Sequence, residues 1–207
     1  MLHTKLYFFI ETLLLLVFPI YLTVVSPAFL ENRHFVMAFG LLYILFLTRH
    51  LIFPKIFPLF RFPSLKSLFF YTLMPSVFVI GIMWLLYGIE PRLIIDPDKI
   101  VTLSFLPWFA PLILYPLLSV PLQEIIFRWF YMNRISAVFS SQKSIVLIAA
   151  ILFGFAHISM GPTTLIGTFI LGLWWGMLYL KTKNLWPTMI AHSMVGNFLI
   201  WLTLVQP

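Results

Sequence analysis

Three ionisable side chains stand inside long apolar stretches of this chain: Glu124, His157 and His192. A charged group within a bilayer is costly unless it is paired or faces a polar cavity, so each is a candidate functional residue. A glutamate beside a histidine can orient and deprotonate water, while a second histidine and an amide such as Asn197 can stabilise an oxyanion. These residue types point to hydrolysis within a membrane, without a serine or cysteine nucleophile.

Glu124 has a basic partner in its own segment. In the run 121–128, Arg128 follows Glu124 by four residues, which places both side chains on one face of a helix. That pair alone is equally consistent with a structural ion pair that fixes helix packing. One glutamate and two histidines also form a set that binds zinc with an open position. The residue types therefore leave open a metal site of Glu124, His157 and His192 beside a metal-free reaction.

The composition indicates a polytopic membrane protein. Hydrophobic residues make up 62% of the chain and charged residues 9%, whereas an ordinary soluble domain is about 25% charged. The net charge of +7 is scattered between apolar segments, with no Gly-rich phosphate loop, so we expect the lipid bilayer as partner and no nucleic acid. The absence of cysteine excludes disulfides and thiolate metal sites. We predict one transmembrane domain over residues 1–207.

Seven apolar segments approach the ~20 residues that a membrane span needs. They cover about residues 6–25, 35–53, 68–87, 100 into the Glu124 motif, 144–157, 163–180 and 185–205. Prolines at 107, 111, 116 and 121 interrupt the fourth, and interior prolines remove helix hydrogen bonds. Ser119 before Pro121 is typical of a new helix start. The predicted fold is all-α, with about seven transmembrane helices and a broken helix before the Glu124 motif.

The predicted loops also give an orientation. With the amino terminus in the cytoplasm, ten Lys and Arg residues fall on the cytoplasmic side and three on the other, which is a positive-inside bias. At ~1.5 Å per helical residue, Glu124, His157 and His192 then lie roughly 15, 20 and 10 Å from the cytoplasmic face. Because three spans place them at similar depth, we expect one site that opens to the cytoplasmic side.

These motifs resemble the CAAX-protease and bacteriocin-processing family of intramembrane proteases, also called CPBP or Abi. The pattern of that family is Glu-Glu-x3-Arg on one span, Phe-x3-His on the next and His-x3-Asn/Asp on a later one. Here Gln123-Glu124-x3-Arg128 matches the first motif with one change. Phe153-x3-His157 matches the second motif fully.

The third motif is matched with a shift. His192 begins it, but the fourth following residue is Gly196, and Asn197 stands one place later. A second departure is Gln123, because the family's first glutamate is the one assigned to activate water, and an amide is not a base. The resemblance covers residues 116–198 and agrees with the family in order, spacing and helix placement.

The resemblance implies a helical membrane fold with a cavity open to the cytoplasm, in which activated water cleaves a peptide bond. The implied catalytic residues are Glu124, His157, His192, Asn197 and Gln123, and the supporting residues are Arg128 and Phe153. We favour no cofactor, although the family has also been described as metalloproteases, and zinc would be held by Glu124, His157 and His192. The implied substrate is a membrane-embedded or lipid-anchored protein or peptide. The expected location is a prokaryotic inner or plasma membrane.

Two other function classes stay open at this point. The chain is alternatively a catalytically degenerate member that binds or scaffolds a membrane protein, and Gln123 motivates that reading. A small proton-coupled transporter is the third hypothesis, because Glu and His in broken helices also suit proton relays. No internal repeat is visible in the sequence, which counts against the transporter.

Overall fold

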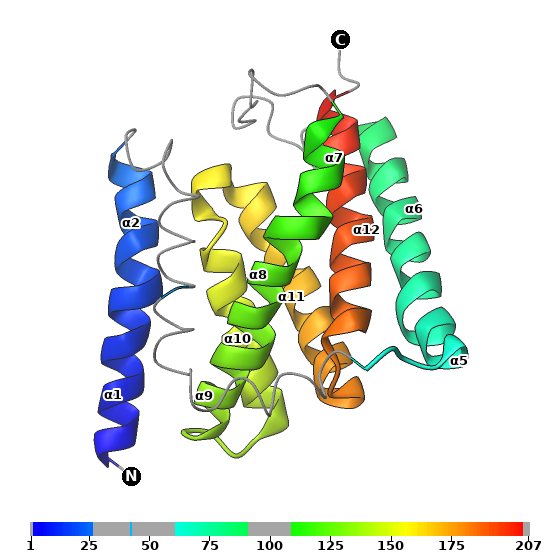
Figure 1. Ribbon diagram of the computed structural model, residues 1–207. Helices are drawn as coiled ribbons and strands as arrows, with labels where there is room; N and C mark the ends of the chain where they lie inside the picture. The colour runs from blue at the N-terminus through cyan, green and yellow to red at the C-terminus, as the bar shows by residue number, and fades with distance from the viewer. Residues whose placement is uncertain (1, 27–41, 43–60, 91–108, 205–207) are drawn as a thin grey trace.

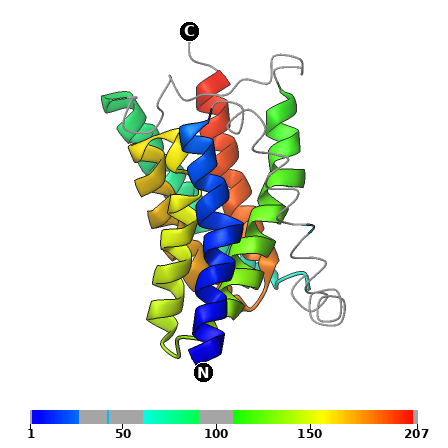
Figure 2. The same cartoon turned by 90° about the vertical axis from the view of Figure 1, so that its left-hand side faces the viewer.

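The computed structural model describes residues 2–26, 42, 61–90 and 109–204, and within these residues all regular structure is helical. Figures 1 and 2 show the helices running side by side along one axis, with the start of α1 at one end and the end of α12 at the other. The prediction of an all-helical fold is confirmed for this part of the chain. Apart from residue 42, the predicted span at 35–53 lies outside the described residues, as does the start of the fourth span, so the count of seven and the single domain stay predictions.

Two helices flank the centre of the molecule. The first consists of α1 (Leu2–Thr12), a π-helical turn (Leu13–Val17) and α2 (Phe18–Val25). The second consists of α5 (Leu65–Leu68), a π-helical turn (Phe69–Leu73) and α6 (Met74–Ile89). Both occupy segments predicted as spans.

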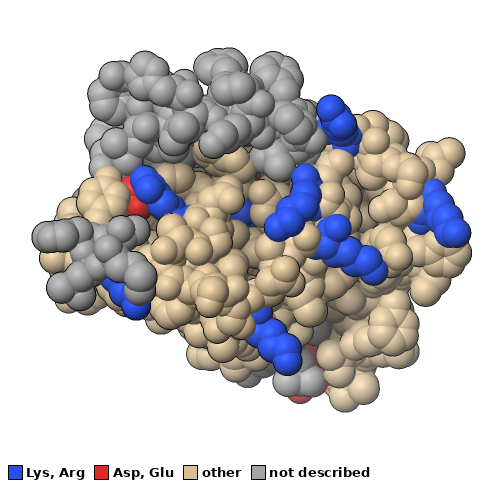
Figure 3. Space-filling model, turned by 90° about the horizontal axis from the view of Figure 1, so that it is seen from below, with Lys and Arg blue, Asp and Glu red and all other residues tan. Residues whose placement is uncertain are grey.

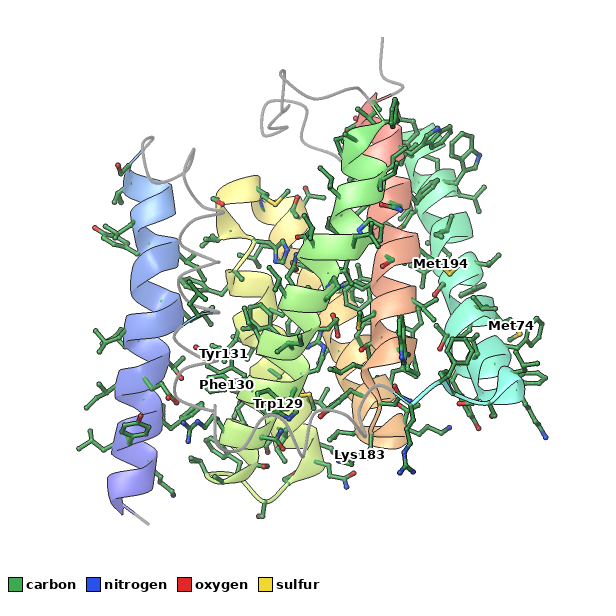
Figure 4. All side chains as sticks on the ribbon, in the orientation of Figure 1. Met74, Trp129, Phe130, Tyr131, Lys183 and Met194 are labelled. Carbon is green, nitrogen blue, oxygen red and sulfur yellow. The ribbon has the colours of Figure 1, made fainter. Side chains whose placement is uncertain are left out.

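A polar contact joins α1 to the end of the central helix. Glu11 is buried, and its Oε1 lies 3.2 Å from NH2 of Arg134. The guanidinium of Arg134 also lies 5.3 Å from the ring centroid of Phe130. Figure 4 shows Phe130 and Tyr131 in the space between the central helix and α1. Glu11 therefore pairs with a basic residue of another helix within the apolar segments.

The central helix runs without a break from Ala110 to Ser136 over 27 residues. It consists of α7 (Ala110–Leu114), a π-helical turn (Tyr115–Ser119), α8 (Val120–Glu124), a second π-helical turn (Ile125–Tyr131) and α9 (Met132–Ser136). The predicted broken helix before the Glu124 motif is therefore wrong.

The missing amide of Pro116 explains how the helix continues. A proline has no N–H to donate to the carbonyl four residues earlier, and here that carbonyl belongs to Leu112. The side chain of Asn197 donates to the Leu112 oxygen at 3.0 Å instead. The N–H of Val120 bonds the carbonyl of Tyr115, which closes the π-helical turn. The chain thus widens locally and does not start a new helix.

Three more helices complete the described part: α10 (Gln142–Phe155), α11 (Pro162–Thr182) and α12 (Leu185–Leu204), with a 3₁₀ turn (Ile158–Met160) after α10. Small residues bring α10 and α11 together, because a Cβ on Gly172 would lie 3.1 Å from the Ala150 Cα. Gly176 likewise approaches Val146, whereas Gly167 has open space around it. Two of the three glycines of α11 therefore make the close approach to α10.

The outer surface of the bundle is apolar. Within the described residues, the helices Leu65–Ile89, Ala110–Ser136 and Pro162–Thr182 are long and apolar enough to cross a membrane. Figure 3 shows Lys and Arg side chains spread over one end of the molecule. At this end α1 begins, α9 and α11 finish and α10 starts, near Lys5, Arg134, Lys143 and Lys181. The protein is therefore an integral membrane protein whose basic residues gather at one end of these helices.

Candidate active site

A buried ionic group joins α8 to α12. Glu124 Oε1 lies 2.8 Å from Nδ1 of His192, and Glu124 Oε2 lies 3.3 Å from Nε of Arg128. Glu124 and Arg128 have no exposed side-chain surface, and His192 is 3% exposed. A carboxylate only accepts hydrogen bonds, so Nδ1 of His192 is the donor and Nε2 is the remaining nitrogen of the neutral ring. The structure thus brings three of the predicted site residues together.

Aromatic rings from three other helical segments fix the His192 ring. Trp175 of α11 stacks on it with ring centroids 4.2 Å apart, and Phe153 of α10 meets it edge-on at 5.6 Å. Tyr115 of the first π-helical turn meets it edge-on at 5.8 Å. Close-packed rings restrict rotation of the imidazole, so His192 is held in one orientation with Nδ1 on Glu124.

His157 stands just beyond α10, two residues after its last residue Phe155. The prediction that the fifth span reaches His157 therefore overestimated this helix by two residues. Nδ1 of His157 lies 2.8 Å from the carbonyl oxygen of Phe153, and the two rings are 4.9 Å apart. Since a carbonyl accepts, this nitrogen carries the hydrogen. The Phe153 ring thus touches both histidines, and the Arg128 guanidinium lies 4.9 Å from its centroid.

The two predicted amides are engaged by helix groups in this structure. The side-chain nitrogen of Gln123 donates to the Ser119 hydroxyl at 2.9 Å, and that of Asn197 donates to the Leu112 carbonyl at 3.0 Å. Gln123 is buried and directly precedes Glu124 in α8. Roles for these amides in positioning water or stabilising an oxyanion stay predictions.

The zinc site that the sequence left open is not formed as a cluster of three donors within the described residues. Within this part of the chain, no group of three His, Asp, Glu or Cys side chains is close enough to hold a metal ion. Nδ1 of His192 is bound to Glu124, and Nδ1 of His157 faces a backbone carbonyl. Nε2 is then the nitrogen of each ring that is left for a metal ion, and the absence of a cofactor stays a prediction.

Two residues of the site were missed from the sequence. Trp175 and Tyr115 both contact the His192 ring, but an aromatic residue in an apolar segment carries no signal that separates it from ordinary core. The one available signal was Gly196, which leaves the fourth position of the third motif without a side chain. A glycine there admits a neighbouring group, and the structure places Tyr115 against it.

Comparison with known proteins supports the same region. Residues 105–198 match a family model described as Rce1-like, type II CAAX prenyl endopeptidase Rce1-like. No curated protein and no solved structure matches the chain. The matched region contains all three motifs and the buried Glu124–His192 pair. Residues 105–198 are therefore similar to the CAAX prenyl endopeptidase family, in agreement with the resemblance that the three motifs indicated.

Proposed function

We propose that this protein is an intramembrane endopeptidase that hydrolyses a peptide bond in a membrane-embedded or lipid-anchored protein. The observation that carries the proposal is the 2.8 Å contact between Glu124 and His192, buried among apolar helices within the matched region. A buried carboxylate bound to an imidazole is the arrangement that makes a histidine an effective general base. The family match supports the endopeptidase class.

Glu124 acts through His192 in this proposal. Glu124 is fully buried and paired with Arg128, so it orients the imidazole and stabilises the imidazolium. Nε2 of His192 removes a proton from water, whose oxygen attacks the carbonyl carbon of the substrate. The same nitrogen then gives the proton to the leaving amine as the C–N bond breaks. His157 lines the site next to Phe153 and helps to position this water. Our mechanism uses no metal ion.

The proposed substrate reaches the site from the cytoplasmic side. The basic end of the bundle in Figure 3 supports a cytoplasmic amino terminus under the positive-inside rule. The matched family is described as CAAX prenyl endopeptidases, so a peptide with a prenylated cysteine and three further residues is the first probe. Its lipid chain would anchor it in the bilayer beside the exposed apolar helices.

The test uses purified protein in liposomes and a quenched fluorescent peptide with this prenylated end. Glu124→Gln is nearly isosteric and keeps an acceptor for His192, but it leaves the Arg128 charge unpaired. The double variant Glu124→Gln with Arg128→Met, which removes both charges, is therefore assayed beside it, and the unfolding midpoint of each variant is measured. We expect kcat to fall about 10³–10⁴-fold. Lys143→Gln is the control, because Lys143 is exposed at the start of α10. Equal hydrolysis by Glu124→Gln and the unchanged chain would refute the proposal.

One observation favours a second candidate, a family member that binds membrane proteins without cleaving them. Gln123 replaces the family's water-activating glutamate, and its amide is bonded to Ser119. Gln123→Glu separates the two candidates. If only this variant hydrolyses the probe, the natural chain is a binding module. Hydrolysis by the unchanged chain excludes the binding module, and Glu124→Gln then tests whether the activity depends on Glu124.

A further inference from the structure

Tyr115 occupies the space of the side chain that Gly196 lacks. An ideal Cβ on Gly196 would lie 2.6 Å from Cζ of Tyr115, and closer still to its hydroxyl oxygen and Cε1. Real Cβ atoms do not approach other atoms so closely, so the ring fits there only because residue 196 is glycine. Gly196 follows His192 by four residues on α12 and hence lies on the same face. The Tyr115 hydroxyl therefore stands one helical turn from the proposed base.

The hydroxyl is an available hydrogen-bond donor. Within the described part of the chain, the Tyr115 hydroxyl makes no hydrogen bond to another residue, and the side chain is half-buried. Two other donors nearby are engaged: the Gln123 amide donates to Ser119 and the Asn197 amide to Leu112. Arg128 and Trp175 carry N–H groups without a hydrogen bond, but both side chains are fully enclosed, whereas Tyr115 is only half-buried. The neutral rings of the two histidines carry their hydrogen on Nδ1, so their Nε2 atoms accept and do not donate.

A hydrolytic site needs a donor where negative charge develops on the carbonyl oxygen. We propose that the Tyr115 hydroxyl donates this hydrogen bond, an inference that rests on the proposed endopeptidase function. As the water oxygen bonds to the carbonyl carbon, the C=O electron pair moves onto oxygen, and the Tyr115 O–H stabilises it. Tyr115 keeps its proton throughout, and the intermediate collapses when the C–N bond breaks and the amine takes its proton from His192.

Tyr115→Phe tests the donor directly. Phenylalanine keeps the ring against Gly196 and His192 and removes only the hydroxyl. We expect kcat on the prenylated fluorescent peptide to fall about 10²–10³-fold, with KM within about threefold and an unchanged unfolding midpoint. Tyr131→Phe is the matched control, because it removes a hydroxyl from the same helix on the side toward α1 (Figure 4). A wild-type kcat in Tyr115→Phe would overturn the inference.

A position swap gives an independent test. Gly196→Asn alone should lower the unfolding midpoint because its Cβ collides with the Tyr115 ring. In Tyr115→Ala with Gly196→Asn, the amide enters the space that the ring leaves. We expect this double variant to regain at least about tenfold in kcat over Tyr115→Ala, since a placed amide is also an oxyanion donor. An unchanged unfolding midpoint in Gly196→Asn would contradict the packing of Tyr115 against Gly196. A kcat of the double variant equal to that of Tyr115→Ala would contradict it as well.

The Glu124→Gln variant separates the two proposals. If Glu124→Gln is inactive while Tyr115→Phe has full activity, the endopeptidase function stands and the role of Tyr115 is wrong. If the unchanged chain does not cleave the probe, or Glu124→Gln cleaves it equally well, the endopeptidase function fails and the role of Tyr115 fails with it.

Discussion

The Glu124–Arg128 pair should control the stability of the protein as well as its activity. Both side chains are fully buried, and the described residues offer no hydrogen bond to any nitrogen of the Arg128 guanidinium. The charge of Arg128 is therefore balanced by the carboxylate of Glu124 and by the face of Phe153. Removing one charge of such a pair leaves the other uncompensated in an apolar environment.

The structure gives the size of the effect. At 3.3 Å between Arg128 Nε and Glu124 Oε2, an effective dielectric constant of about 20 gives an attraction of roughly 5 kcal/mol. Arg128→Met or Glu124→Gln alone should each lower the free energy of unfolding by about 3–5 kcal/mol. The double variant removes both charges, keeps an acceptor for His192, and should lie within about 1 kcal/mol of the unchanged protein.

Unfolding by sodium dodecyl sulfate in mixed micelles, followed by tryptophan fluorescence, measures these four proteins as a double-mutant cycle. The expected coupling energy is about 3–5 kcal/mol. The Glu11–Arg134 pair is the internal control, because 37% of the Arg134 side chain is exposed. The coupling of that pair should be smaller. If the effects of the two single substitutions on the free energy of unfolding simply add, the coupling energy falls below about 1 kcal/mol. That result would refute the argument that each charge depends on the other.

Three further predictions concern other parts of the site and its frame. Asn197→Ala leaves the Leu112 carbonyl without its donor and should lower the free energy of unfolding by about 1–3 kcal/mol in the same titration. Gly172→Val places a side chain against Ala150 and should cost about 1–3 kcal/mol, whereas Gly167→Val, in open space, should be neutral in a thermal unfolding assay. Treatment with 1,10-phenanthroline should leave the rate of peptide hydrolysis unchanged, and a loss of activity restored by zinc would contradict the metal-free mechanism.

The positions of the helices were largely predictable, because apolar runs of membrane length are visible without tertiary information. The predicted segments 163–180 and 185–205 correspond to α11 (Pro162–Thr182) and α12 (Leu185–Leu204). The continuity of the central helix was not predictable. The carbonyl freed by Pro116 is bonded by a residue 85 positions away, and local sequence rules cannot include a donor so distant in the chain.

The site was predictable only in part for the same reason. The spacing of four residues indicated the Glu124–Arg128 pair, because that contact lies within one helix. The contact of Glu124 with His192 spans 68 positions, and the signals for it were depth in the membrane and the resemblance of the motifs to a family. Depth does not give the rotation of a helix. Hence the ring contacts of His192 with Trp175 and Tyr115 had to come from the structure.

The two changes in the third motif are connected in the structure. Moving the amide from position 196 to 197 turns it about 100° around α12, away from the face of His192 and onto the Leu112 carbonyl. This leaves position 196 as glycine, and the ring of Tyr115 fills that space. One shift of the amide therefore both supports the central helix beyond Pro116 and admits a hydroxyl group next to the proposed base. On this reasoning the altered motif is a rearranged site, and the Tyr115→Phe variant distinguishes it from a degenerate one.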